Sequence, residues 1–274
     1  MGETKLYTVM FEGDAISTTV TSSGDAVKRW LDEVLYVHRR RLHKLVVGLD
    51  VEWRPALGPW YNPTALLQLC VGRRCLVFQL LHADYVPDAL AEFLDDPRCW
   101  ISWLDPPPSG ADGGLSAQIE GGGSTQWIFA EGESGATALV SLASPSTAKR
   151  PSSTVCLTCL RQHRRRVGDN TRFRFVGVGV QDDAVRLNND LHLAVSNTVD
   201  LAELAADEMG RPDLRSAGLK ALASVVMGAT VDKPERVRKG RWDAYELSDQ
   251  QIKYACIDAF VSFEVGRKLL SGDC

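Results

Sequence analysis

Features that mark several large protein classes are missing from this sequence of 274 residues. No apolar run approaches the roughly 18 residues that a membrane-spanning helix needs, so we expect no membrane contact. The phosphate-binding pattern GxxxxGK(S/T) is absent, which excludes a P-loop helicase. Basic residues are not in excess, because 31 Lys and Arg stand against 35 Asp and Glu. This balance excludes a strongly basic coat for nucleic acid, although a local basic patch can coexist with an acidic active site.

Cysteines in a paired arrangement are also lacking. The seven cysteines are an odd number, and Cys70, Cys75 and Cys256 lie in apolar segments, which predicts reduced, buried thiols. Cys156 and Cys159 form one CxxC, and neither a second CxxC nor an HxxxH accompanies it at the spacing of zinc ligands. We therefore expect no zinc site.

Residues 99–171 differ in composition from the rest of the chain. These 73 residues hold 9 Gly, 5 Pro and 10 Ser, and such a composition buries too little apolar surface to offset the entropy lost on ordering. A well-patterned helix precedes the block and a strand follows it. The sequence therefore predicts a single domain made of 1–98 and 172–274, interrupted by a disordered insertion or by a retained intron translated in frame.

Outside this block, strands and helices alternate, which predicts one α/β domain with a mixed sheet. The expected strands are a pair within 5–22, then 44–53, 65–71, 75–80, 173–181 and 198–201. The expected helices are 24–43, 84–96, 182–194, 218–227 and 248–270, the last with Ser248 as its N-cap.

Asp50 and Glu52 stand two residues apart in the apolar strand 44–53. Residues i and i+2 of a strand project from the same face, so two carboxylates repel each other there, and desolvation makes the repulsion worse. A bound cation relieves this repulsion, and hard oxygen ligands suit Mg²⁺ or Mn²⁺. The alternative is that both residues face solvent at the strand end.

Tyr254 and Asp258 lie four residues apart in the predicted C-terminal helix and therefore share a helix face. A tyrosine beside a metal site can orient a water molecule or help to deprotonate it. The alternative is an ordinary pair of surface residues.

Asp182 and Asp183 begin the helix that follows the glycine-containing strand 173–181. The segment is not a dinucleotide-binding GxGxxG, because an acid at the third glycine position would repel a pyrophosphate. One of the two acids could also simply cap the helix.

In this order along the chain, the three motifs resemble those of the DEDD superfamily of 3′–5′ exonucleases, in its tyrosine-bearing, ribonuclease D-like branch. The segments most similar to the Werner-syndrome-type exonuclease family, especially its plant members, are 47–55, 65–71, 175–187, 218–226 and 247–265. The resemblance covers 1–98 and 172–274 but not the block between them. It implies a ribonuclease H-like fold, with a mixed five-stranded sheet flanked by helices.

The resemblance also implies a metal-dependent nuclease. Its catalytic residues would be Asp50, Glu52, Asp183, Tyr254 and Asp258. The four acids would bind two Mg²⁺ ions, with Mn²⁺ as a substitute, and the tyrosine would position the attacking water. Asp183 is preferred to its acidic neighbour because of its spacing from the glycines. The implied reaction removes nucleoside 5′-monophosphates from DNA 3′ ends in the nucleus, with the cytoplasm as a second location. Any unwinding would need a separate partner, such as a RecQ-type helicase.

Aromatic and basic residues near these motifs are candidate contacts for nucleic acid. Trp53 directly follows the first motif, where a ring can stack on the terminal nucleotide, and core packing is the alternative. The candidates before the last motif are Lys220, Lys233, Arg236, Arg238, Lys239, Arg241 and Trp242. The alternative for the basic residues is a solvated loop.

Two other functions stay open at this stage. A ribonuclease D-like enzyme would use the same motifs on RNA 3′ ends. A non-catalytic nucleic-acid-binding protein would result if the 99–171 insertion disturbs the strand that delivers Asp183.

Overall fold

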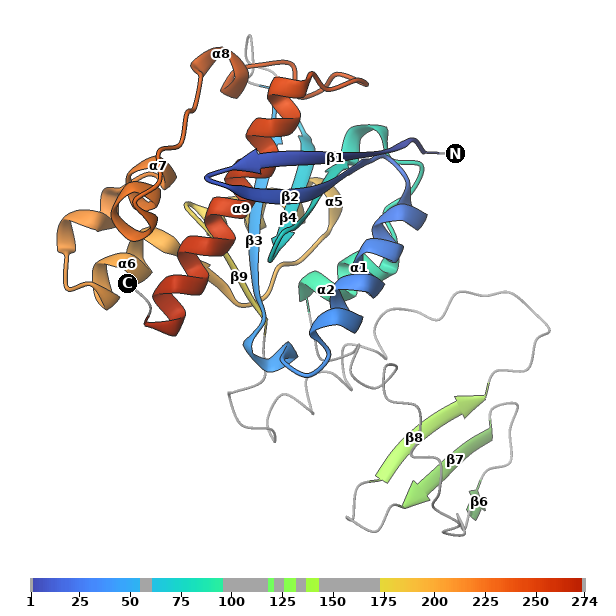
Figure 1. The fold of residues 1–274 in the computed structure, drawn as a ribbon. Helices are drawn as coiled ribbons and strands as arrows, with labels where there is room; N and C mark the ends of the chain where they lie inside the picture. The colour runs from blue at the N-terminus through green and yellow to red at the C-terminus, as the bar shows by residue number, and fades with distance from the viewer. Residues whose placement is uncertain are drawn as a thin grey trace. The chain divides into compact units, whose positions relative to one another are not determined.

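The computed structural model describes residues 2–54, 61–95 and 173–272, together with the backbone of three strands between 118 and 142. The chain divides into two units, of which the first is Met1–Leu104 with Asp169–Cys274 and the second is Asp105–Gly168. Figure 1 shows the elements of both units.

The first unit contains a seven-stranded mixed sheet with the strand order β1-β2-β5-β4-β3-β9-β10. Its strands are β1 (Thr4–Phe11), β2 (Asp14–Thr21), β3 (Val46–Trp53), β4 (Thr64–Val71), β5 (Arg74–Gln79), β9 (Arg174–Gly177) and β10 (Thr198–Asp200). Its α-helices are α1 (Gly24–His38), α2 (Asp88–Asp95), α5 (Val180–Leu191), α6 (Leu201–Glu208), α7 (Leu219–Leu222), α8 (Glu235–Arg238) and α9 (Asp249–Ser271). Shorter turns of 3-10 or π type are Leu42–Lys44, Leu80–His82, Pro212–Ser216 and Ala223–Met227.

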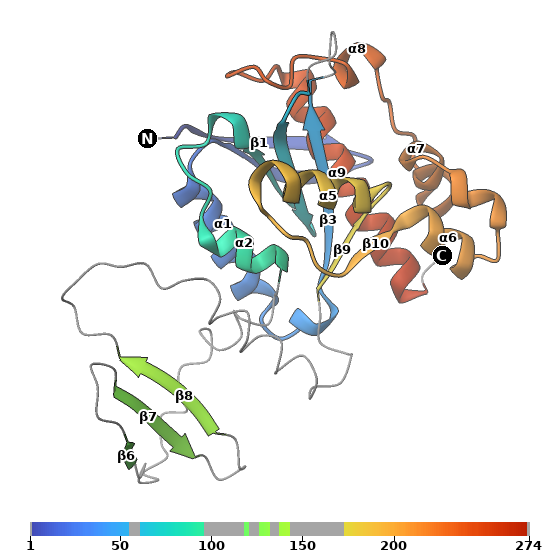
Figure 2. The ribbon, with the colours of Figure 1, turned by 180° about the vertical axis from the view of Figure 1, so that it is seen from behind.

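Helices cover both faces of this sheet. Helix α9 lies across one face, whereas α1, α2 and α5 lie on the other (Figures 1 and 2). Each face has its own hydrophobic cluster, one including residues of α9 and the other including residues of α1, α2 and α5. The predicted α/β class with a mixed sheet between helices is therefore confirmed.

The sheet has seven strands rather than the five that the resemblance implies. The hairpin of β1 and β2 accounts for the difference, because β2 pairs in parallel with β5 and extends the sheet at that edge. The strands expected from the sequence pattern also number seven, because they include the pair within 5–22 that turns at Gly13.

Strand β3 carries the first acidic motif and is an interior strand. It pairs antiparallel with β4 and parallel with β9. Its residues Val47, Leu49 and Val51 belong to the cluster of α1, α2 and α5. Because side chains alternate along a strand, Asp50 and Glu52 project from the opposite face, toward α9.

Gly48 allows α9 to pack directly against β3. A Cβ atom at this position would overlap the backbone carbonyl oxygen of Ala259, and it would lie 2.7 Å from the backbone nitrogen of Phe263. The close approach brings the middle of α9 beside the following residues of the strand. The N-terminus of α9 has a capping box between Ser248 and Gln251, which confirms Ser248 as the N-cap.

Replacing Gly48 with alanine is expected to lower the free energy of unfolding by about 1–3 kcal/mol, because overpacking a helix–strand contact forces the backbone apart. The matched control is Gly218→Ala, where an added Cβ meets nothing within 4 Å, and which should cost clearly less. Urea unfolding of both variants measures the difference. Equal losses in the two variants would contradict a tight contact at Gly48.

Some element boundaries differ from expectation. The strand predicted over 173–181 ends at Gly177. The helix that follows it, α5, begins at Val180 instead of residue 182. The cause is Gly179, whose φ of 73° lies in the left-handed region and ends the strand. Helix α6 is not among the expected elements, yet the Asp200 carboxylate caps it by accepting the backbone N–H of Ala202 at 2.8 Å.

The second unit contains the backbone of a separate antiparallel sheet with the order β6-β7-β8. Its strands are β6 (Gln118–Glu120), β7 (Gln126–Glu131) and β8 (Thr137–Leu142). The rest of 99–171, including the predicted insertion boundaries and the CxxC, lies outside the described residues.

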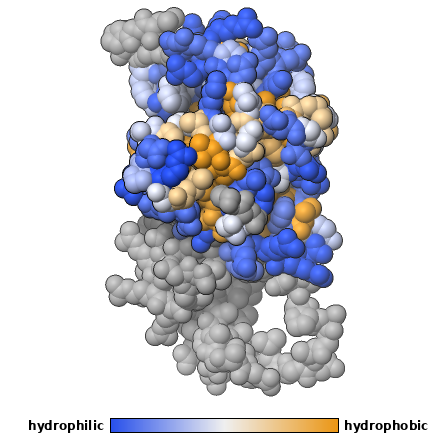
Figure 3. All heavy atoms as spheres, turned by 60° about the vertical axis from the view of Figure 1, so that its left-hand side comes forward, coloured by the Kyte–Doolittle hydropathy of each residue, from blue (hydrophilic) through white to orange (hydrophobic). Residues whose placement is uncertain are grey.

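One face of the molecule is mainly hydrophilic among its described residues (Figure 3). Seen from the side that carries α6 and α7, hydrophilic residues surround a smaller apolar area (Figure 3). In the described part of the chain, no helix combines the length and apolar composition that crossing a bilayer requires.

Candidate active site

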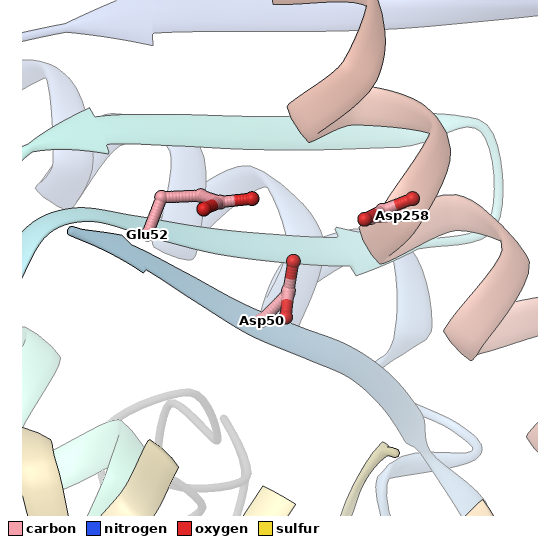
Figure 4. Close-up of side chains that lie close together, drawn as sticks. All are labelled: Asp50, Glu52 and Asp258. Carbon is pink, nitrogen blue, oxygen red and sulfur yellow. The ribbon is translucent and has the colours of Figure 1, made fainter. Parts of the chain in front are cut away.

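Three carboxyl groups meet between β3 and α9. One carboxylate oxygen from each of Asp50, Glu52 and Asp258 can be chosen so that all lie within 4.8 Å of one another. Figure 4 shows the two acids of β3 beside Asp258 of α9. Asp50 and Glu52 lie on the same face of β3 because side chains alternate along a strand. The close packing of α9 at Gly48 brings Asp258 beside them.

The cluster is strongly perturbed in the absence of a cation. Burial raises the pKa of Asp50 well above its ordinary value, and the charges of Asp258 and Asp183 raise it further. Burial, followed by the charge of Asp50, raises the pKa of Glu52 to about 10. These groups resist ionisation because their negative charges have lost water and face one another. The donor set of buried carboxylate oxygens fits Mg²⁺ or Mn²⁺.

Asp183 lies in the first turn of α5 at the edge of this cluster. Burial, followed by the charge of Asp182, raises the pKa of Asp183 to about 7. Its charge in turn raises the pKa of Asp50 and Glu52, although it is not among the three acids that share the 4.8 Å limit. Asp182 is exposed, so the arrangement favours Asp183 as the fourth acid.

Tyr254 lies one turn before Asp258 on the same face of α9 and is 7% exposed. Burial raises the pKa of its phenol, and the charges of Asp258 and Glu52 raise it further. The hydroxyl therefore stays protonated at neutral pH and is available as a hydrogen-bond donor.

Lys233 joins the cluster, although its sequence context indicates a contact with the nucleic-acid backbone. Its Nζ lies 2.7 Å from Oδ2 of Asp258 and 5.4 Å from the ring centre of Tyr254. The Lys233 charge lowers the pKa of Asp50 and Glu52, partly opposing the effect of burial. Lys233 thus supplies positive charge to the metal-free site.

Trp242 is not placed to contact nucleic acid, contrary to its assignment from the sequence. Its side chain is fully buried, its ring centre lies 5.7 Å from that of Tyr254, and its indole N–H donates to the Arg238 carbonyl oxygen at 3.0 Å. A side chain with no exposed surface cannot stack on a nucleotide, so Trp242 is a core residue that supports Tyr254 from behind.

The basic candidates remain on the surface. Lys220 is exposed on α7, and Arg238 is exposed on α8, where its guanidinium lies 3.9 Å from Glu235. Arg241 is exposed and pairs with Asp243 at 3.3 Å. Among the ion pairs of the described residues, none joins these three basic side chains to the carboxylates of Asp50, Glu52 or Asp258.

Trp53 is 37% exposed and stacks on an arginine that the sequence analysis does not single out. The guanidinium carbon of Arg186 lies 4.1 Å from the Trp53 ring centre and 4.9 Å from that of Tyr61. Arg186 is one turn after Asp183 on α5, and its charge lowers the pKa of Asp183. The i, i+3 spacing of an acid and an arginine is the signal that could have identified it.

A comparison with known families bears on this site. Residues 141–271 match the model of a family described as 3′–5′ exonuclease. The matched segment contains Asp183, Tyr254 and Asp258, whereas Asp50 and Glu52 precede it. This similarity over the C-terminal segment supports the prediction of a nuclease domain.

Relatives with similar sequences carry corresponding names. A 3′–5′ exonuclease of Arabidopsis thaliana is 34% identical over 94 residues, which are 34% of this chain and 32% of the relative. The human exonuclease 3′-5′ domain-containing protein 2 is 32% identical over 150 residues, 53% of this chain and 24% of that protein. The chain thus spans a third or less of the length of these two relatives.

A solved structure shares the fold. Escherichia coli RNase D, an exoribonuclease involved in structured RNA processing, aligns with a TM-score of 0.53 and 17% identity. The alignment covers 91% of this chain and 43% of that chain. The predicted ribonuclease H-like fold is confirmed by this similarity.

Proposed function

We propose that this chain is a metal-dependent 3′–5′ exonuclease of the tyrosine-bearing DEDD type, and that it removes nucleoside 5′-monophosphates from DNA 3′ ends. The observation that carries the proposal is the group of half-buried Asp50 and buried Glu52 and Asp258, with Tyr254 beside it. Folding leaves these acids close together and poorly solvated, an arrangement that a binding surface does not require and a metal-dependent hydrolase does.

The four acids have distinct places in the proposed site. Asp50, Glu52 and Asp258 would hold one divalent cation, and Asp183 would contribute to a second from α5. Bound Mg²⁺ or Mn²⁺ supplies positive charge that attracts the phosphodiester and stabilises the negative charge on the departing 3′ oxygen. The protonated Tyr254 hydroxyl would hydrogen-bond the attacking water and fix its direction.

A cavity beside Tyr254 supports a path for the nucleic-acid strand. It has a volume of about 430 Å³ and lies between the tip of the β1–β2 hairpin and the helices α8 and α9. Phe11 and Val237 contribute apolar surface to it. Arg236 and Lys253 contribute positive charge, and Glu12 and Asp232 contribute negative charge. Apolar surface suits bases and positive charge suits phosphates, so we place the strand upstream of the 3′ end in this cavity.

RNA is the alternative substrate, and a non-catalytic nucleic-acid-binding protein is the alternative from another class. The experiment that separates them uses 3′-recessed DNA and an RNA of matching sequence, each with Mg²⁺ or with EDTA. We expect stepwise shortening of the DNA from its 3′ end in Mg²⁺ and none in EDTA. Shortening of RNA alone would favour the ribonuclease, and binding without shortening of either substrate would reject both enzymes.

Two further proposals concern the cell rather than the site. We propose the nucleus as the main location and the cytoplasm as a second one, with a separate RecQ-type helicase as a partner that exposes 3′ ends. Imaging of the tagged full chain and co-purification with a helicase test these proposals independently of the activity.

A further inference from the structure

Gln68 on β4 is a buried polar residue with an unusual environment. Its side chain is 0% exposed, and among the described residues neither Oε1 nor Nε2 has a hydrogen-bond partner. Buried polar groups in folded proteins nearly always have partners, because an unsatisfied amide lowers stability. All eight residues of β4 are buried, so an apolar residue would fit this strand better. The glutamine therefore needs another reason.

The register of the sheet places Gln68 beside the carboxylate cluster. Gln68 is directly opposite Asp50 in the antiparallel pair of β4 and β3. Opposite residues project from the same face, with Cβ atoms about 4.5–5.5 Å apart. The cross-strand partner of Gln68 on its other side is Val77 of β5, whose side chain forms no hydrogen bonds. Of these two partners, only Asp50 can pair with the amide.

A second glutamine in the same sheet provides a contrast. Gln79 on β5 is also buried, at 7% exposure, and its Nε2 donates to the backbone oxygen of Tyr245 at 2.8 Å. Gln79 thus has an ordinary structural role, in which a buried amide links a strand to a loop. Gln68 makes no such link.

We propose that Gln68 is a positioning residue of the metal site, and that its amide N–H donates to the Asp50 carboxylate when a divalent cation holds that carboxylate ionised. An ionised carboxylate only accepts hydrogen bonds, and a primary amide supplies a donor without adding charge. Outer hydrogen bonds of this kind fix the orientation of ligating carboxylates. The inference rests on the proposed function, since it takes the cluster of Asp50, Glu52 and Asp258 as a metal site.

The test replaces Gln68 with methionine, which has a similar volume and no amide. Calorimetric titration of the full chain with Mn²⁺ should show about 10–100-fold weaker binding than wild type. The melting temperature in EDTA should be unchanged or higher, because the variant no longer buries an unsatisfied amide. Gln79→Met is the matched control, and it should melt at a lower temperature in EDTA while binding Mn²⁺ like wild type.

The results that would overturn the role of Gln68 differ from those that would overturn the proposed function. Wild-type Mn²⁺ affinity in Gln68→Met overturns the proposal, and so does a lower melting temperature in EDTA or a failure to fold, since either makes Gln68 a core residue. If wild type binds Mn²⁺ and Asp50→Asn does not, while Gln68→Met matches wild type, only the role of Gln68 is lost. If wild type itself binds no Mn²⁺, the proposed metal-dependent function falls as well.

Discussion

Replacing Asp50 with asparagine is expected to slow the release of 3′ nucleotides on the order of 10³-fold and, in the same protein, to raise stability in EDTA. The loss of rate follows because asparagine keeps the shape of the side chain but removes a negative charge that binds the cation. The gain in stability follows because Asp50 is half-buried and lies beside the buried acids Asp258 and Glu52. Exchanging such a charge for a neutral group is expected to stabilise the metal-free protein by about 1–3 kcal/mol.

The stabilisation by Asp50→Asn should also depend on pH. Burial raises the pKa of Asp50 well above its ordinary value in the folded protein, whereas in the unfolded chain the carboxyl ionises near pH 4. Above pH 4 the unfolded state therefore binds fewer protons, so the contribution of Asp50 to stability is present at low pH and declines as pH rises. The advantage of the variant should grow between pH 5 and pH 8.

Urea unfolding in EDTA at several pH values, together with a single-turnover assay in Mg²⁺, measures both effects. Asp32→Asn is the control, since Asp32 is an exposed acid on α1 and its replacement should change neither quantity. A rate within about tenfold of wild type in Asp50→Asn would remove Asp50 from the metal site. A loss of stability would show that its charge is compensated in the metal-free protein.

Local chemistry explains why the acidic residues could be predicted from the sequence. Two acids at alternating positions of an apolar strand, such as Asp50 and Glu52, are costly unless a cation binds them, and the pattern is visible without a structure. Tyr254 and Asp258 follow from the helical repeat in the same way. The distance between the two motifs is different, because it depends on how closely α9 approaches β3 at Gly48, and no local pattern encodes that approach.

The surroundings of several other residues depend on tertiary packing and could not be predicted from the sequence. Trp242 stands among basic residues, as a stacking residue would, but it is fully buried beside Tyr254 and its N–H donates to the Arg238 carbonyl oxygen. Gln68 is one polar residue in an apolar strand, and its importance appears only from its register with Asp50. Lys233 belongs to a segment rich in charge, and only the structure shows that it turns inward to Asp258.

Replacing Lys233 with methionine is expected to lower stability in EDTA by about 2–4 kcal/mol at pH 8, because it leaves the Asp258 carboxylate buried without its partner. The pair joins Nζ and Oδ2 at 2.7 Å, and the Asp258 side chain is only 4% exposed. Burial raises the pKa of Asp258 while Lys233 lowers it, so the variant should bind a proton there more readily. Its loss of stability should therefore be smaller at pH 5, where protonation removes the uncompensated charge.

A bound cation should replace the lysine in this role. Mg²⁺ or Mn²⁺ at the cluster neutralises Asp258, so adding either ion should restore more stability to Lys233→Met than to wild type, in which lysine and cation compete for one carboxylate. Lys239→Met is the matched control, because Lys239 pairs with Glu235 at 2.6 Å with both side chains more than half exposed, and such a pair contributes about 1 kcal/mol or less. Thermal unfolding of both variants with EDTA and with each ion makes the comparison. Equal responses of the two variants would show that Lys233 forms an ordinary surface pair and that a cation at the cluster does not share its carboxylate.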